Sequence, residues 1–227
     1  MSPPSPVALE PLDHQIAPLR EMIIRSLRRA VERGILGPGQ RLVEKDLCAQ
    51  LGVSRTSLRE ALRELQAEGV LTYMSNRGLT VAGVSRRDAE NIYRIRAALE
   101  PLIVEQFIEN ADAGDIEALG RDAEEVIAAF RGDDVVAIIE SKRQLYDRIC
   151  KGAMNPVAFE ILHRLTLRTS QLRRRAVVRP ERRVQSISEI EALVAAIARR
   201  DVPAARAAAE RHVLNAAASA LSTVGAD

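Results

Sequence analysis

Residues 53–69 read VSRTSLREALRELQAEG, a pattern that predicts a short helix with one apolar side and one cationic side. Ser54 is a favourable N-cap, because its side-chain oxygen can accept a hydrogen bond from an amide of the first turn. Gly69 ends the pattern. Residues four positions apart share one face of a helix, so Arg55 and Arg59 are expected to project together. The opposite, apolar side consists of Leu58, Ala61, Leu62 and Leu65.

Two more helices are predicted upstream of this one. Apolar residues recur at helical spacing through residues 16–33, and Gly34 ends that run. Residues 43–51 form the second helical pattern, with acidic residues in its first turn, where the helix dipole favours anions. Gly52 is its expected left-handed cap. The Gly-Pro-Gly triplet at 37–39 predicts a tight turn between the two helices.

Strand-forming residues occur together at only one place. The runs 71–74 and 79–82 flank the turn residues Ser75-Asn76-Arg77-Gly78 and predict a β-hairpin. A lone hairpin is marginally stable in water, so it must pack on neighbouring helices. An arginine-rich helix by itself is more often a solvated surface. The ordered set of helices, tight turn and hairpin favours a winged helix-turn-helix, whose last helix fits the major groove of duplex DNA.

Contacts to DNA bases are expected near the start of the helix at 55–68. Arg55 and Thr56 lie there, and an arginine can pair bidentately with guanine, which contributes ~1–3 kcal/mol of discrimination. Glu60 and Glu64 are expected to hold the arginines of the cationic side in place. The hairpin tip offers a cation and an approachable backbone to the minor groove or to a phosphate.

After the hairpin, the pattern is helical throughout. Ser85 is expected to cap a long helix that ends near Asn110, and glycines and prolines separate five later segments. The predicted fold class is therefore mainly α, with a winged domain at 15–84, an antiparallel helical bundle at 85–222 and a loose tail at 1–14. The later helices are expected at 113–131, 134–151, 156–177, 182–200 and 203–222.

Composition excludes several other classes of protein. The net charge is only +2, but just three of the 33 cationic residues are lysine, and arginine is the better residue for bidentate contacts to phosphate and guanine. Aromatic residues make up 3% of the chain and tryptophan is absent, which argues against a stacking platform for single strands. The chain lacks a long uncharged apolar run and signal-peptide features, so neither a membrane span nor export is expected. The absence of GxSxG, HExxH and P-loop motifs argues against an enzyme.

The two cysteines, Cys48 and Cys150, lie in amphipathic stretches and lack metal-ligand spacing. Two buried free thiols are the simplest interpretation. A reducing, cytoplasmic location is expected on that basis.

Four ordered segments, at 34–42, 53–62, 68–71 and 77–81, resemble the DNA-binding domain of GntR-type bacterial transcriptional regulators. The resemblance covers roughly residues 15–84. Ser57 departs from it, because the family often has proline there, and the change should not disturb the recognition helix. Carried over position by position, the resemblance implies that the DNA contacts are Arg41, Lys45, Ser54, Arg55, Thr56, Arg59, Arg77 and Gly78.

The helical remainder resembles the FadR-type C-terminal domain, or FCD, which binds effectors and forms dimers. Segments 93–101, 152–156 and 196–201 carry this looser resemblance. It implies a homodimer that places two recognition helices in successive major grooves of a pseudo-palindromic operator. It also implies that a small-molecule effector changes the affinity for DNA, with repression as the commoner outcome.

Many members of that family hold a divalent metal with an Asp-x-x-x-His pair and two later histidines. Here the corresponding positions are Lys142, Tyr146 and Ile190, and only the last histidine, His212, remains. A protonated lysine and an isoleucine cannot coordinate a metal, and one histidine is not a metal site. We therefore expect neither a metal nor another cofactor.

Lys142 would place a positive charge where relatives hold a metal. One hypothesis is that an anionic effector, such as a carboxylate, binds Lys142 and Arg96, while Tyr146 and His212 supply hydrogen bonds. The alternative is that Lys142 pairs with a buried acid or reaches solvent, and that the helical domain is purely structural. The sequence leaves both open. The arginines between 173 and 183 could also contact an anion, although a solvated face paired with acids is the favoured interpretation.

Overall fold

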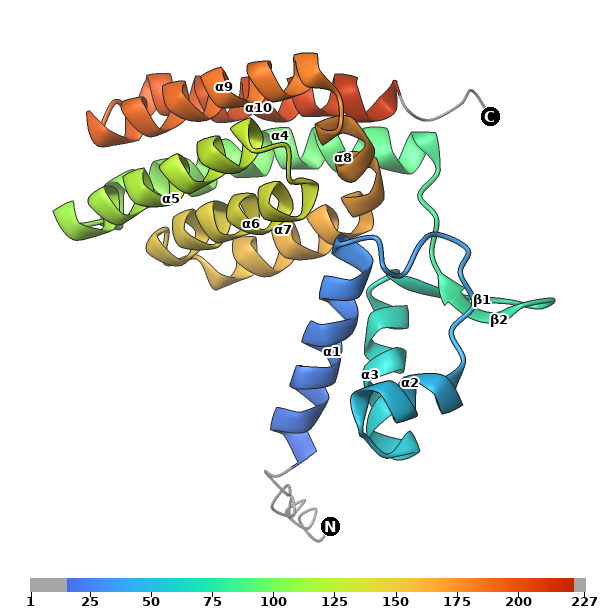
Figure 1. The fold of residues 1–227 in the computed structure, drawn as a ribbon. Helices are drawn as coiled ribbons and strands as arrows, with labels where there is room; N and C mark the ends of the chain where they lie inside the picture. The colour runs from blue at the N-terminus through green and yellow to red at the C-terminus, as the bar shows by residue number, and fades with distance from the viewer. Residues whose placement is uncertain (1–15, 223–227) are drawn as a thin grey trace, which may run out of the picture.

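The computed structural model describes residues 16–222, in which three hydrophobic core clusters form: one in the first part of the chain and two among the later helices. Figure 1 shows a helical bundle and, beside one of its ends, a smaller domain built from the first part of the chain. The tail expected at 1–14 lies outside the described residues. The mainly helical fold class, with one small hairpin, is confirmed.

The smaller domain has the predicted order of elements. Ser54 caps the third helix by accepting a hydrogen bond from the amide of Ser57 at 3.2 Å, and Gly52 ends the second with φ +65°. The buried side of the third helix consists of the four predicted residues at 58, 61, 62 and 65. The elements are α1 (Ile16–Glu32), α2 (Glu44–Leu51), α3 (Arg55–Ala67), β1 (Leu71–Met74) and β2 (Gly78–Val81).

The hairpin differs from the prediction by one residue. Gly78 was expected in a four-residue turn, but it pairs with Met74 as the first residue of β2, so the turn has three residues. Gly78 has φ +75°, a conformation that glycine adopts without strain. At the base of the hairpin, Leu71 and Val81 are buried in the core of the domain, so the base is anchored while the tip is exposed.

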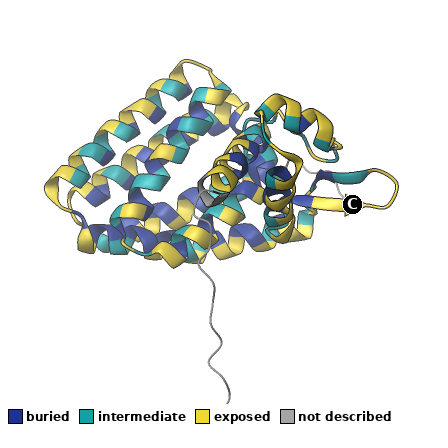
Figure 2. Cartoon of the chain, turned by 90° about the horizontal axis from the view of Figure 1, so that it is seen from below, coloured by how far each residue is buried: buried dark blue, intermediate teal, exposed yellow. Residues whose placement is uncertain are grey.

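The helical domain begins at Ser85, which caps its first helix by accepting a hydrogen bond from the amide of Asp88 at 3.0 Å. The first and last helices of this domain pack together extensively. Figure 2 shows the helices of the bundle buried on one side and exposed on the other. The helices are α4 (Arg86–Asn110), α5 (Ala113–Arg131), α6 (Val135–Gly152), α7 (Pro156–Arg168), α8 (Ser170–Val177), α9 (Pro180–Ala198) and α10 (Val202–Leu221).

The prediction of a single helix at 156–177 is wrong, because the helix is interrupted at Thr169. The backbone there has φ −97° and ψ 7°, and the hydroxyl of Thr169 donates to the carbonyls of Leu165 and Thr166 at 3.3 and 3.4 Å. Such back-bonding by threonine commonly bends a helix. The break separates α7 from α8 and lets both helices contact α1.

The end of α1 is fastened to the helical domain by several contacts. The side chain of Gln171 donates to the carbonyl of Val31 at 2.7 Å, and Arg33 pairs with Glu140 of α6. Leu167 of α7 is buried in the core of the smaller domain. The Arg174 guanidinium lies directly against Gly34, where a Cβ would come within 2.6 Å of it. The junction therefore ties α1 to α6, α7 and α8.

Candidate functional site

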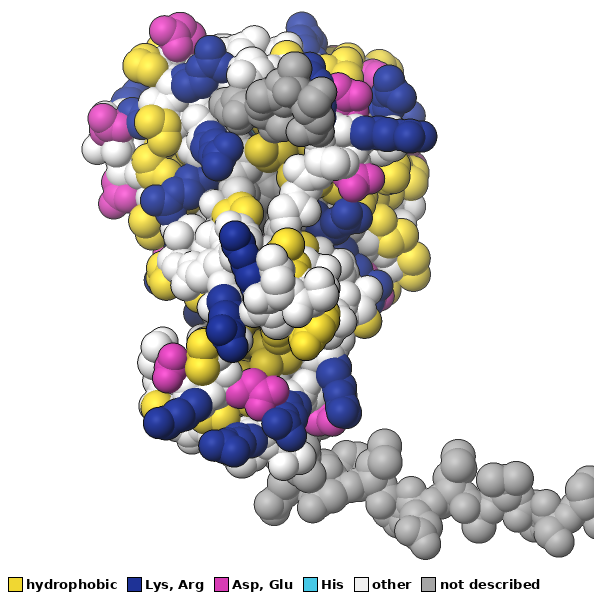
Figure 3. Space-filling model, turned by 90° about the vertical axis from the view of Figure 1, so that its right-hand side faces the viewer, with side chains coloured by type: hydrophobic (Ala, Val, Ile, Leu, Met, Phe, Trp, Pro, Cys, Tyr) yellow, Lys and Arg dark blue, Asp and Glu magenta, His cyan; other side chains and the backbone are white. Residues whose placement is uncertain are grey.

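The residues predicted to contact DNA, which we call the DNA face, all belong to the smaller domain. The seven side chains among them are exposed, and Gly78 is half-buried. Figure 3 faces the side of the molecule that bears the hairpin, and basic side chains project there from the smaller domain with acidic ones among them. Arg55 and Thr56 open α3 directly after its serine cap. The amides of that first turn can also hold a phosphate.

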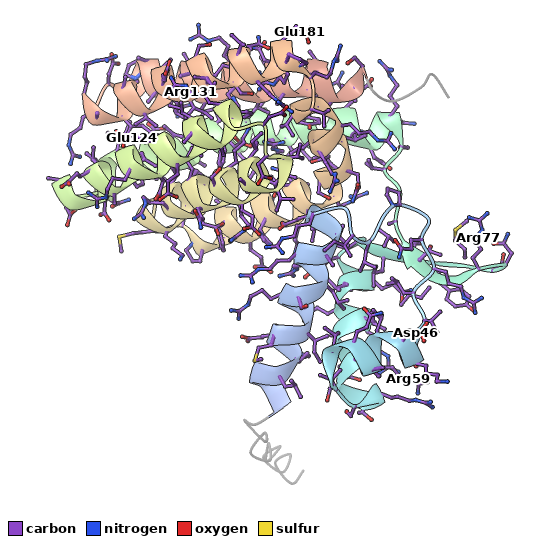
Figure 4. All side chains as sticks on the ribbon, in the orientation of Figure 1. Asp46, Arg59, Arg77, Glu124, Arg131 and Glu181 are labelled. Carbon is purple, nitrogen blue, oxygen red and sulfur yellow. The ribbon has the colours of Figure 1, made fainter. Side chains whose placement is uncertain are left out.

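Arg59 has a partner that the sequence did not suggest. Its Nε donates to both carboxylate oxygens of Glu44, at 2.9 and 3.1 Å, so α2 orients an arginine of α3. Of the two acids expected to hold the arginines, Glu60 pairs with Arg63 at 3.0 Å, whereas Glu64 lies 3.6 Å from Arg20 of α1. In Figure 4, Arg59 and Arg77 project from the same side of the domain, away from the bundle.

The remaining cations of this face make no ion pair within the described part of the chain. They come from four places: the strand-like segment before α2, the first turn of α2, the start of α3 and the hairpin tip. Exposed cations without partners can bind phosphates and release their counterions. These residues are Arg41, Lys45, Arg55 and Arg77.

A second candidate site is a cavity enclosed by α1, α4, α6, α7 and α8, which we call the cationic cavity. Its free volume is about 40 Å³, room for a few water molecules or a very small ligand. Arginine, lysine and tyrosine side chains line it together with apolar ones. The lining residues are Glu32, Arg96, Lys142, Arg143, Tyr146, Asp147, Cys150, Phe159, Leu162, His163, Thr166 and Arg173.

Arg96 and Tyr146, two of the predicted effector residues, both line this cavity, and the buried Glu100 lies beside them. The Nε atom of Arg96 donates to Glu100 at 2.7 Å, and both side chains are almost fully buried. The Nη1 atom of Arg96 is buried and has no hydrogen-bond partner among the described residues. Burial, and next the negative charge of Glu100, raise the pKa of the Tyr146 phenol well above its ordinary value. The tyrosine is therefore a neutral donor.

Lys142 lines the cavity from α6. Its ammonium contacts a histidine of α10, which in turn contacts an acid of α9. Its Nζ lies 3.3 Å from Nε2 of His212, whose Nδ1 lies 2.5 Å from Glu189. A proton on Nδ1 satisfies both contacts, because Nδ1 then donates to the carboxylate and Nε2 accepts from the lysine. Arg182 and Asn215 also donate to Glu189, at 2.7–3.0 Å.

Burial dominates the ionisation of this network. Burial, followed by the charges of Arg182, Arg173 and Arg96, lowers the pKa of Lys142 to about 7. Burial and the charge of Lys142 lower the pKa of His212 to about 3, so this imidazole is neutral at physiological pH. His212 is not among the lining residues; it positions Lys142 rather than facing the cavity.

The arginines between 173 and 183 do not form one solvated face. Arg173 lines the cationic cavity, with its Nε buried and without a partner among the described residues. Arg182 is buried on Glu189, and Arg183 pairs with Asp133. Arg175 and Arg179 are exposed, as the sequence suggested for the whole group. The sequence pattern did not predict the interruption between α7 and α8 at Thr169, after which Arg173 lies in the lining of the cavity.

Comparison with known proteins agrees with both halves of this architecture. The model of the bacterial regulatory proteins of the gntR family matches residues 19–81, and the FCD domain model matches residues 91–215, more than half of the chain. The chain belongs to the GntR family. It is a DNA-binding transcriptional regulator with an FCD domain at its C-terminal side, and the family is not enzymatic.

Individual relatives support this assignment. McbR of Escherichia coli, an HTH-type transcriptional regulator, is 32% identical over 142 residues, which are 63% of this chain and 64% of McbR. YdhC of Bacillus subtilis is 31% identical over 57% of this chain and 58% of its own length. These matches thus span less than two thirds of either relative. The solved structure of E. coli McbR superposes with a TM-score of 0.78 and 27% identity, covering 86% of this chain and 93% of that one.

The metal site implied by the FCD resemblance does not fit this GntR regulator. Lys142 lies against the one retained histidine, and Ile190 is buried with no ligand atom to offer. Within residues 16–222, no group of three or more His, Cys, Asp or Glu side chains could hold a metal ion.

Two smaller predictions concern the cysteines and the membrane. Cys48 is half-buried and Cys150 is buried, and both are free thiols. Burial raises the pKa of Cys150 to about 12, which makes it a poor nucleophile. Among the described helices, none has the length and apolar character needed to span a membrane.

Proposed function

We propose that this GntR regulator acts as a homodimer whose two winged domains, at 15–84, read the halves of a pseudo-palindromic operator. The helical domains, at 85–222, would form the dimer and bind a small carboxylate that changes the affinity for DNA. The observation that carries the DNA part is the exposed, serine-capped start of α3, with Arg55 and Thr56 at its first two positions. Helix-turn-helix proteins contact base edges from this place.

The DNA contacts can be tested by substitution of one exposed arginine. Arg55→Ala should lose ~1–3 kcal/mol of discrimination, about 5- to 150-fold, between the preferred duplex and a scrambled one. Arg131→Ala is the matched control, because Arg131 is also exposed but lies on the bundle, far from the face described (Figure 4). The measurement is a gel-shift titration on duplexes that the wild-type protein selects from a random pool. Unchanged discrimination in Arg55→Ala would contradict the proposed contacts.

The effector site is supported by two cations that have no acidic partner among the described residues and by two further hydrogen-bond donors. The cations are Lys142 and Arg173. The donors are the Arg96 Nη1 atom, which has no hydrogen-bond partner within the part of the chain that the structure describes, and the neutral hydroxyl of Tyr146. A carboxylate accepts hydrogen bonds from all of these groups. The free volume favours a small acid over a larger one. His212 serves this site indirectly, by holding Lys142.

A thermal-shift screen tests the effector site. Acetate, glycolate and larger organic acids, at constant ionic strength against chloride, should raise the melting temperature of the wild-type protein in order of fit. Lys142→Ala should abolish that rise. Equal shifts in both proteins, or no shift with any acid, would favour a helical domain that is purely structural.

The sign of regulation and the oligomer need separate measurements. Repression is the outcome that we propose, because a dimer bound across a promoter blocks its use. A reporter gene behind the selected duplex should be expressed less when the regulator is present. Sedimentation should give twice the chain mass of 24.9 kDa.

A further inference from the structure

The DNA-binding domain contributes one of its own side chains to the cationic cavity. Glu32, the last residue of α1, lines that cavity with Lys142 and Arg173. The same three residues also line an adjoining space of about 30 Å³. Within the described residues, Glu32 is the one lining residue that precedes α4. A carboxylate of one domain thus lies among the cations of the other.

The surroundings of Glu32 show which cations compensate its charge. The residue is only 8% exposed, and its carboxylate makes no hydrogen bond or ion pair within the part of the chain that the structure describes. A buried carboxylate is costly unless nearby charges compensate it.

Two of the cavity arginines already have acids of their own, since Arg96 pairs with Glu100 and Arg143 with Asp147. Lys142 has a neutral imidazole as its partner, and Arg173 has no acid within ion-pair distance in the described chain. The negative charge of Glu32 acts on Arg173, opposing the effect of burial on the pKa of that guanidinium. Lys142 and Arg173 are therefore the cations left for Glu32.

We propose that Glu32 is an internal carboxylate that competes with an external one for Lys142 and Arg173. The inference rests on the proposed effector site and adds the means by which that site reaches the DNA-binding domain. An acid that binds the two cations displaces Glu32 and favours the state in which the end of α1 has left the cavity. A ligand can shift a conformational equilibrium only by binding the two states differently, and competition with Glu32 supplies that difference.

The end of α1 is well placed to pass this change to the recognition helix. One residue before Glu32, the carbonyl of Val31 accepts from Gln171, and one residue after it, Arg33 pairs with Glu140. Further back, α1 packs along α3 in the core of the winged domain. A displaced Glu32 strains these neighbouring contacts, so the orientation of α3 relative to the bundle depends on which carboxylate the cavity holds.

The test compares acetate binding to the full-length wild type and to Glu32→Gln by calorimetry. Glutamine keeps the shape of the side chain but removes the competing charge, so acetate should bind about tenfold more tightly. Glu140→Gln is the matched control, since it breaks an ion pair at the same junction without lining the cavity. It should bind acetate as the wild type does. Equal or weaker binding by Glu32→Gln would overturn the inference.

A second measurement follows the mobility of the junction between the end of α1 and the helical domain. Acetate should increase hydrogen exchange of the amides at 29–36 in the wild type, and in Glu32→Gln exchange there should be high without acetate. Lys142→Met separates the two proposals. If Lys142→Met loses acetate binding while Glu32→Gln matches the wild type, the effector site stands and the role of Glu32 is wrong. If none of the three proteins binds acetate, or all bind it equally, both proposals are wrong.

Discussion

The DNA face and the cationic cavity use the same kind of residue under opposite conditions. On the DNA face, Arg55 and Arg77 are exposed and make no ion pair with any of residues 16–222, and Arg59 is paired with an acid in contact with water. In the helical domain, Arg96 and Arg182 are almost completely buried on acids. Exposed pairs contribute little to stability and are screened by salt, whereas a broken buried pair leaves an uncompensated charge. The first arrangement suits exchange with phosphates, and the second holds a site in shape.

The largest expected effect comes from breaking the buried network. Glu189→Ala leaves Arg182 without its acid and His212 without the acceptor that orients it toward Lys142, so the free energy of unfolding should fall by ~3–5 kcal/mol. Urea denaturation measures it. Glu117→Ala removes the acid of an exposed pair with Arg121 and should cost ~1 kcal/mol at most. Similar losses in the two variants would mean that burial does not distinguish the two regions.

The ionisation of Lys142 gives a smaller effect that depends on pH. Its pKa of about 7 means that the ammonium loses its charge as the pH rises from 6 to 8. Acetate affinity should therefore fall, by about tenfold per pH unit above 7. Lys142→Arg keeps its charge throughout, so its affinity should not fall. On the other helices, the charged or titratable groups around Lys142 are Glu32 (α1), Arg96 (α4), His163 (α7), Arg173 (α8), Arg182 and Glu189 (α9) and His212 (α10); on α6 itself they are Arg143, Tyr146, Asp147 and Cys150.

The same shift affects stability in the opposite direction. Between pH 7 and about 10.4 the unfolded lysine binds a proton that the folded one does not, so the free energy of unfolding gains a contribution that rises with pH. This contribution should be absent from Lys142→Met, and urea denaturation at several pH values can show it. Identical pH slopes in the two proteins would contradict the lowered pKa.

The smallest effect is expected at Glu44, which holds Arg59 on the DNA face. Glu44→Gln should change the free energy of unfolding by only ~0.2–1 kcal/mol, because the pair is exposed. It should nevertheless strengthen binding to any duplex at low salt, because it removes a negative charge and frees a cation for phosphate. Gel shifts at two salt concentrations measure this gain. A gain that persists at high salt would indicate a change of shape rather than of charge.

Local patterns were sufficient for most of the fold. The serine caps at 54 and 85 and the left-handed Gly52 were predicted from neighbouring residues, because capping involves only one turn of chain. The predicted second strand begins one residue later than the strand in the structure, since Gly78 suits a turn and a strand end equally well. The break at Thr169 was missed because a helix of α7 and α8 together would be acceptable by its own periodicity.

The sequence by itself determined the order of the elements, the face of α3 that carries cations and the class of protein, because helical periodicity, caps and turns are local properties. Only the tertiary structure decided which charges meet. Arg59 meets an acid of another helix, Lys142 meets a histidine 70 positions away, and Glu32 enters a cavity of the other domain. The reason is physical: ion pairs and pKa values depend on distance and burial, and both are set by packing between segments that are remote in the chain.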